Sequence, residues 1–158
     1  MAITFDHQSA QYALQAEGRA NPTRLGAENV SSGELEFTKV VVTLDDSESA
    51  ADTLAITALP IGAVVLPEFS KAIVTVDSLT NCTVDIGYEG NPDALADGID
   101  LAPGGIVEFT SGTAPADLVP TPLVADTDEK LASIYATFGG TPAGTGTIYF
   151  VIAFRRNR

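Results

Sequence analysis

The chain has no tryptophan, one cysteine and one histidine among its 158 residues. The single Cys82 cannot form an internal disulfide, and its place in an alternating apolar segment predicts a buried structural residue. A nucleophile–base–acid triad needs a base beside its nucleophile, and zinc sites need several Cys or His ligands, so the lone His7 supports neither. We therefore expect a protein that is not an enzyme and carries no cofactor.

Basic residues are scarce as well. Eight Lys and Arg stand against 21 Asp and Glu, which gives a net charge of −13 at pH 7. A groove that follows a nucleic-acid backbone needs clustered Lys and Arg, so nucleic acid is not an expected partner. No apolar run reaches the roughly 18 residues of a membrane span, and the N-terminus lacks a signal-peptide pattern. We expect no membrane partner and synthesis in a reducing cytoplasm.

The stretch from Leu54 to Tyr88 consists of short apolar runs, each broken by Pro, Gly or a polar pair. Successive side chains of a strand point to opposite faces, so alternation of apolar residues predicts half-buried strands. Three such alternating sets follow one another: Leu54, Ile56 and Ala58; Ala72, Val74 and Val76; Cys82, Val84, Ile86 and Tyr88. This stretch is therefore predicted to form consecutive strands at the centre of the fold.

Further strands are expected at 34–45, 63–66, 106–110, 131–138 and 147–154. Residues 91–105 and 111–127 are expected to be loops, and the glycine-rich residues 139–146 a hairpin loop. About eight short strands, loops of uneven length and no long helix predict an all-β, single-domain β-sandwich of the jelly-roll-like kind.

Within 34–45, the buried set is expected to change midway. Leu35 and Phe37 begin one apolar face, whereas Val40, Val42 and Leu44 lie on the other. One extra residue in a strand moves every later side chain to the opposite face, so we expect a bulge near Thr38 or Lys39.

Residues 1–33 differ from the sandwich domain predicted for residues 34–158. They are polar, with Phe5, Tyr12, Leu14 and Leu25 as isolated apolar points. Such a segment has too little apolar surface to offset the entropy cost of ordering, so it is either mobile or held against another surface. We predict an extended N-terminal arm in which Phe5, Tyr12 and Leu14 contact a partner.

Aspartates cluster at two places and raise the question of calcium. Asp93, Asp97 and Asp100 form one group, and Asp126, Asp128 and Glu129 form another. Carboxylates in a turn can converge on Ca²⁺, but the ordered spacing of an EF-hand is missing. Asp also favours turns because its side chain accepts hydrogen bonds from nearby backbone N–H groups. Solvated turns are the favoured interpretation and calcium the alternative.

Three of the eight basic residues, Arg155, Arg156 and Arg158, lie in the last four positions. Arginine forms strong paired hydrogen bonds with carboxylates, so this tip could bind acidic residues of a neighbouring subunit. A solvated, frayed terminus explains the same residues equally well.

Four segments of the chain form a recognisable set: a Leu-Pro-x-Gly-Ala-x-Val segment at Leu59–Val65, a Val-Asp-Ile-Gly-Tyr strand at Val84–Tyr88, the Asn-Pro-Asp at Asn91–Asp93, and the last segment, Gly139–Phe154. Together they resemble a type of small virion protein of tailed bacteriophages. The resemblance covers about two-thirds of the chain, and its motifs are structural.

The resemblance implies a capsid decoration, or cement, protein on the outside of the virion, made in the host cytoplasm. Such a protein would bind the major capsid protein and clamp neighbouring capsid subunits, most simply as a homotrimer. Two alternatives remain open: a phage tail or head–tail connector protein, and a β-sandwich carbohydrate-binding module. The last would need exposed aromatic residues, and the chain has four tyrosines, Tyr12, Tyr88, Tyr135 and Tyr149.

Overall fold

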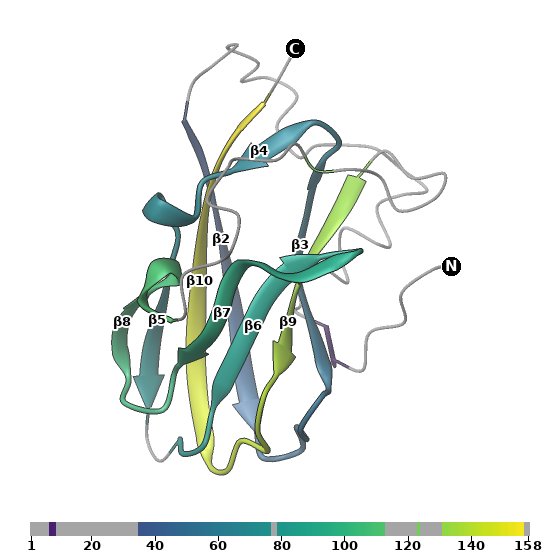
Figure 1. Cartoon of the computed structure of the whole chain (residues 1–158). Coiled ribbons are helices and arrows are strands. Elements are labelled where there is room, and N and C mark those ends of the chain that lie inside the picture. Colours follow the sequence, from purple (N-terminus) through teal and green to yellow (C-terminus); the bar gives the residue numbers. More distant parts are fainter. Residues whose placement is uncertain (1–6, 9–34, 77–78, 113–122, 124–130, 157–158) are drawn as a thin grey trace.

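The computed structural model describes residues 7–8, 35–76, 79–112, 123 and 131–156. Two β-sheets pack face to face in this part of the chain, and its helices are two short 3-10 turns (Figure 1). The predicted all-β, single-domain sandwich is confirmed. No described helix has the length and apolar character needed to cross a membrane.

The first sheet has the strand order β1-β3-β9-β6-β7. Its strands are β1 (His7–Gln8), β3 (Thr53–Pro60), β9 (Leu131–Phe138), β6 (Thr83–Tyr88) and β7 (Asn91–Asp100). β1 runs parallel to β3, and the other neighbours are antiparallel.

The second sheet has the order β2-β10-β5-β8, with β4 paired to the far end of β10. Its strands are β2 (Glu36–Asp45), β10 (Thr145–Arg156), β5 (Lys71–Val76), β8 (Gly105–Glu108) and β4 (Ala63–Val65). The 3-10 turns η2 (Pro67–Phe69) and η3 (Phe109–Ser111) precede β5 and follow β8.

Pairing between the two halves of the chain is nested. β2 pairs with β10 and β3 with β9, so early strands lie beside late ones in each sheet. This order supports the finer classification as a jelly roll, an eight-stranded sandwich of two Greek keys, which stays a prediction.

The core lies between the sheets and is built from alternating residues of both. One buried cluster contains Ile148, Phe150 and Ile152 of β10 together with Val84 and Ile86 of β6. The apolar sets predicted for 131–138 and 147–154 both lie in this cluster, although in 131–138 the opposite side of the strand, with Ser133 and Tyr135, is buried as well. Of the central stretch, Ala72, Val74, Cys82 and Tyr88 are buried as predicted, while the side chain of Val76 lies outside the described part.

The predicted bulge in β2 is wrong. β2 pairs with β10 without interruption from Asp45↔Thr145 to Glu36↔Phe154. Leu35 and Phe37 are 43% and 58% exposed, so one face of β2 is apolar and solvent-exposed rather than switching into the core.

The face shift occurs instead in β3. Its pairing with β9 shifts register between Ala55 and Thr57. Leu54 and Ile56 enter the main core as predicted, but Ala58 joins Ala55 and Leu131 in a separate small cluster. The prediction that Ala58 shares the face of Ile56 is therefore wrong, because one extra residue reverses the later side chains.

Two loop predictions were also wrong: one segment is mostly a strand, and the other is not a hairpin loop. Most of 91–105 is strand β7, at the edge of the first sheet, where Pro92 and the Asp residues are tolerated because one side of the strand needs no ladder hydrogen bonds. Residues 139–146 do not close a hairpin, because β9 and β10 belong to different sheets. This segment carries the chain from one layer to the other.

Candidate interaction surface

The predicted calcium residues lie along one strand. Asp93, Asp97 and Asp100 all belong to β7, and the carboxylate of Asp100 accepts a hydrogen bond from the backbone N–H of Ala102 at 2.9 Å. Among the described residues, no group of three or more His, Cys, Asp or Glu side chains is placed to hold a metal ion. Calcium at β7 stays an untested alternative, and Asp126, Asp128 and Glu129 lie outside the described part.

The C-terminal arginines have different surroundings. Arg156 forms an ion pair with Glu36 of its own chain, with 3.0 Å between Nη2 and Oε2. Arg155 is exposed, and it follows the outward residues of β10 in the alternation of that strand. Arg158 lies outside the described residues. Of this predicted partner site, Arg155 is therefore the described residue that faces solvent.

The N-terminal candidates Phe5, Tyr12 and Leu14 lie outside the described residues. The neighbouring His7 and Gln8 form β1, which pairs with Leu54 and Ala55 of β3. One point of the predicted arm therefore lies against the sandwich of the same chain.

The three described tyrosines offer little platform for a sugar, and Tyr12 lies outside the described residues. Tyr88 and Tyr135 are buried, and the Tyr135 hydroxyl donates a hydrogen bond to the carbonyl oxygen of Tyr88 at 3.2 Å. Burial, followed by the nearby charge of Glu89, raises the pKa of Tyr135. The ring of Tyr149 is partly exposed, but Lys39 Nζ lies 4.5 Å from its centre in a cation–π contact.

The outward side of the second sheet carries an exposed apolar surface that sequence reasoning missed. We call it the β10 face and define it as the outward side chains of β2, β10, β5 and β8. Pairing aligns Val41 with Tyr149, Tyr149 with Ile73, and Ile73 with Ile106, so one apolar row crosses all four strands. Val41 is 45% and Ile106 67% exposed.

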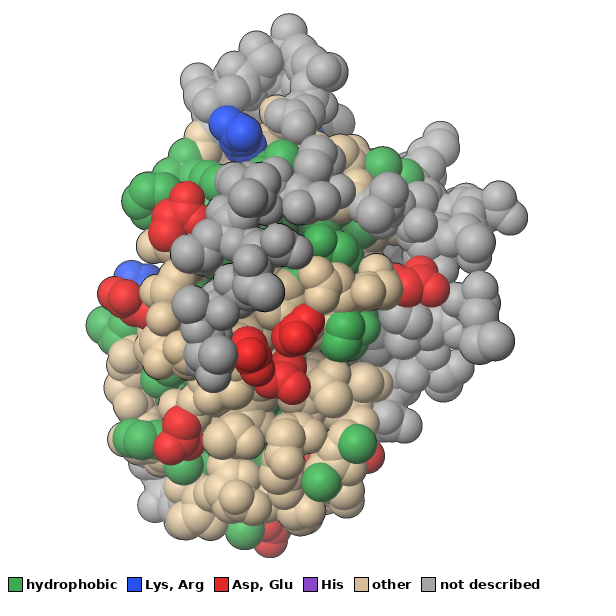
Figure 2. All heavy atoms as spheres, in the orientation of Figure 1, with side chains coloured by type: hydrophobic (Ala, Val, Ile, Leu, Met, Phe, Trp, Pro, Cys, Tyr) green, Lys and Arg blue, Asp and Glu red, His purple; other side chains and the backbone are tan. Residues whose placement is uncertain are grey.

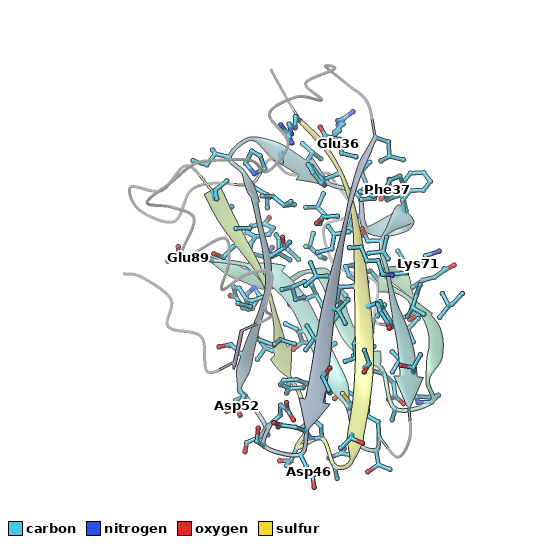
Figure 3. All side chains as sticks on the ribbon, turned by 180° about the vertical axis from the view of Figure 1, so that it is seen from behind. Glu36, Phe37, Asp46, Asp52, Lys71 and Glu89 are labelled. Atoms are coloured by element: carbon cyan, nitrogen blue, oxygen red, sulfur yellow. The ribbon has the colours of Figure 1, made fainter. Side chains whose placement is uncertain are left out.

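A second row lies beside the first on the β10 face. It aligns Lys39, Val151, Lys71 and Glu108 across the same four strands. Phe37, one step further along β2, is also exposed, and Figure 3 shows Phe37 and Lys71 on this side of the sandwich. The consecutive valines Val40, Val41 and Val42 were the available signal, since a strand that is apolar on both faces has more apolar surface than its core needs.

Charge is divided between the two sides of the molecule. Lys39, Lys71 and Arg155 lie on the β10 face, whereas the β6–β7 side bears Asp85, Asp93 and Asp97. Figure 2 shows acidic side chains gathered over β6 and β7, with Lys and Arg side chains at the margins of that view. The Asp85 carboxylate accepts a hydrogen bond from the Gly98 backbone N–H at 2.8 Å, so it also links these strands.

Two solved structures share this fold. A chain in the capsid of Ralstonia phage GP4 is similar with a TM-score of 0.64 and 20% identity, over 96% of this chain and 97% of that chain. A chain of the cyanophage Pam1 capsid asymmetric unit is similar with a TM-score of 0.52 and 18% identity, over 85% of this chain and 94% of that one. Neither a protein-family model nor a curated protein matches the sequence. At these identities the likeness is one of fold.

Proposed function

We propose that this chain is a structural protein of a tailed-phage virion, and specifically a capsid decoration protein. The observation that carries the proposal is the fold similarity to a chain of the Ralstonia phage GP4 capsid, which spans 96% of this chain and 97% of that one. A match of that extent covers nearly the whole of both chains, not a shared core alone. The resemblance of the 59–65, 84–88 and 139–154 segments to phage virion proteins points to the same class independently.

In this proposal the protein binds the outside of the assembled shell and stabilises contacts between neighbouring major capsid subunits. A homotrimer at local three-fold positions would present several copies of each contact surface at once. Linked weak contacts add through effective concentration, so modest individual contacts give firm attachment. A rigid sandwich is suited to this mechanical role.

The experiment is to mix the purified chain with shells of its own phage that were assembled without it, and to measure co-sedimentation. Saturable binding, with more heat-resistant shells, is the expected result. The native mass of the free protein, with and without EDTA, is measured alongside. A trimer that survives chelation is expected, whereas a ring of another symmetry that ignores shells would favour the tail or connector alternative.

The predicted arm is tested in the same assay. Removing residues 1–33 is expected to abolish shell binding while leaving the sandwich folded, because the core is formed by residues from Val40 onward. Circular dichroism and the unfolding midpoint serve as the folding control. A truncated chain that binds as tightly as the full chain would show that the arm is not the clamp.

A further inference from the structure

The β10 face has the composition of a contact surface. Its central row, Val41, Tyr149, Ile73 and Ile106, is apolar and reaches from one edge strand to the other. Phe37 and Ile106 are 58% and 67% exposed, unusually high values for large apolar side chains that lie on one sheet face. Contiguous exposed apolar side chains with charged neighbours are typical of protein–protein contacts.

The β10 face carries more cations than carboxylates, whereas the whole chain carries a net negative charge. The outward side chains of this face include the cations Lys39, Lys71 and Arg155 and the carboxylates Glu108 and Asp45, on a chain of net charge −13. Asp45 lies at the opposite end of the face from Arg155, so the cations outnumber the carboxylates beside the apolar row. A locally positive surface attracts a negatively charged patch of a partner at close range, even though the whole chain is acidic.

A second copy of the chain fits this surface poorly. A two-fold contact between two β10 faces would bring Lys39, Lys71 and Arg155 of both copies together. The acidic β6–β7 side has the complementary charge, but it is the opposite side of the sandwich. Joining opposite sides of successive copies gives an open stack rather than a closed ring.

We propose that the β10 face is the surface that docks on the shell, against a patch of the major capsid subunit that presents apolar side chains flanked by carboxylates. This inference rests on the proposed function and specifies its contact. The apolar row supplies the desolvated centre, and Lys39 and Lys71 lie beside it to pair with the partner's carboxylates.

The test compares two substitutions of the same kind in the full-length protein. Ile106→Asp places a carboxylate in the apolar row, and Ile61→Asp places one at a 43% exposed site in the turn between β3 and β4, outside the β10 face. We expect Ile106→Asp to weaken binding to shells about tenfold or more and Ile61→Asp to leave it unchanged. Both side chains are solvent-exposed, and equal unfolding midpoints confirm that each variant folds.

Charge is tested separately with Lys39→Glu. This change should weaken shell binding at low salt, and the loss should shrink at roughly 0.5 M salt because screening removes it. A loss that is independent of salt would contradict the electrostatic part of the proposal.

The outcomes distinguish a failure of the proposed docking face from a failure of the proposed decoration function. If the wild-type protein binds shells and Ile106→Asp binds equally well, the docking face is wrong while the decoration function stands. If Ile106→Asp converts an oligomer into monomers, the face belongs to a contact between copies and the proposal is overturned. If the wild-type protein ignores shells, the decoration function fails, and the docking face fails with it.

Discussion

Cys82 is completely buried just before β6, and its reactivity follows from that position. Burial, with smaller contributions from the charges of Asp100 and Glu48, raises the pKa of the thiol to about 12. The thiolate is the reactive form of cysteine, so the folded protein should resist iodoacetamide at about pH 8. Modification is expected only after denaturant is added, and rapid labelling of the native protein would contradict this placement.

The same thiol makes stability depend on pH. Between its ordinary value of 9.0 and about 12, the folded protein keeps the thiol proton while the unfolded chain loses it. The contribution of the protonated Cys82 thiol to the free energy of unfolding is therefore complete below pH 9 and is lost as the pH rises from 9 to about 12. Urea unfolding should show a steeper decline for the wild type than for Cys82→Ala, in which Tyr135 still titrates, and parallel declines would contradict the assignment.

Glu36 and Arg156 tie the start of β2 to the end of β10. Their ion pair is about four-fifths buried, and within the described part of the chain neither Glu36 Oε1 nor Arg156 Nε has a hydrogen-bond partner. Removing one member leaves the other charge half-desolvated, so Arg156→Met is expected to cost about 1–3 kcal/mol of unfolding free energy. The double variant Glu36→Gln/Arg156→Met should lose less than the sum of the single changes, as measured in a double-mutant cycle. Additive losses would mean that the pair is not coupled.

At the scale of elements, hydrophobic alternation predicted the strands that lie in the middle of the sheets. β10 buries one side in a regular two-residue pattern from Thr145 to Ile152, and β9 places its predicted face in the core although its other side is largely buried too. β7 was missed because an edge strand needs partners on one side only, which lets Pro92, Asp97 and Gly98 occur within it. The β3 bulge was missed because residues 54–59 are buried on both sides of the strand. In such a strand, a one-residue shift leaves the hydrophobic pattern of the sequence unchanged.

The tight approach of β6 to β7 depends on Gly87. A side chain there would collide with the backbone of Asn91 and Pro92, so neither strand could keep its place. Gly87→Ala is expected to destabilise the protein by about 3 kcal/mol or more. Gly90→Ala is the matched control in the same hairpin: its φ is +83° but its surroundings are open, so it should cost only about 1 kcal/mol. Equal losses at both positions would show that crowding at Gly87 is relieved by a shift of the hairpin.

At the scale of the whole molecule, the sequence predicted the sign of the charge but not its arrangement. The acidic total was the ground for expecting no nucleic-acid groove, and it does not say that Lys39, Lys71 and Arg155 share one side. The valines of β2 signal excess apolar surface on one strand, but the extent of the β10 face could not be derived from the pattern, because Val41 and Ile106 are typical core residues in sequence. Only the register of four strands, drawn from distant parts of the chain, brings them into one row.

The nested pairing determines when the protein can fold. β2 is complete by Asp45, yet its described strand partner is β10, and Asp45 pairs with Thr145 across 100 positions of sequence. A chain that ends before Thr145 should therefore lack cooperative unfolding in urea, although nine of its ten described strands would be present. A sigmoidal urea transition from that truncated chain would contradict this expectation.

During synthesis, the second sheet therefore stays unfinished until β10 (Thr145–Arg156) has been made. β2 and β4 have β10 as their described strand partner, and β5 pairs with β8 on one side and with β10 on the other, so all three strands lack this neighbour until β10 is made. Folds dominated by distant pairings also fold slowly once complete. The net charge of −13 makes copies of the chain repel one another, which opposes their aggregation while β10 is being made.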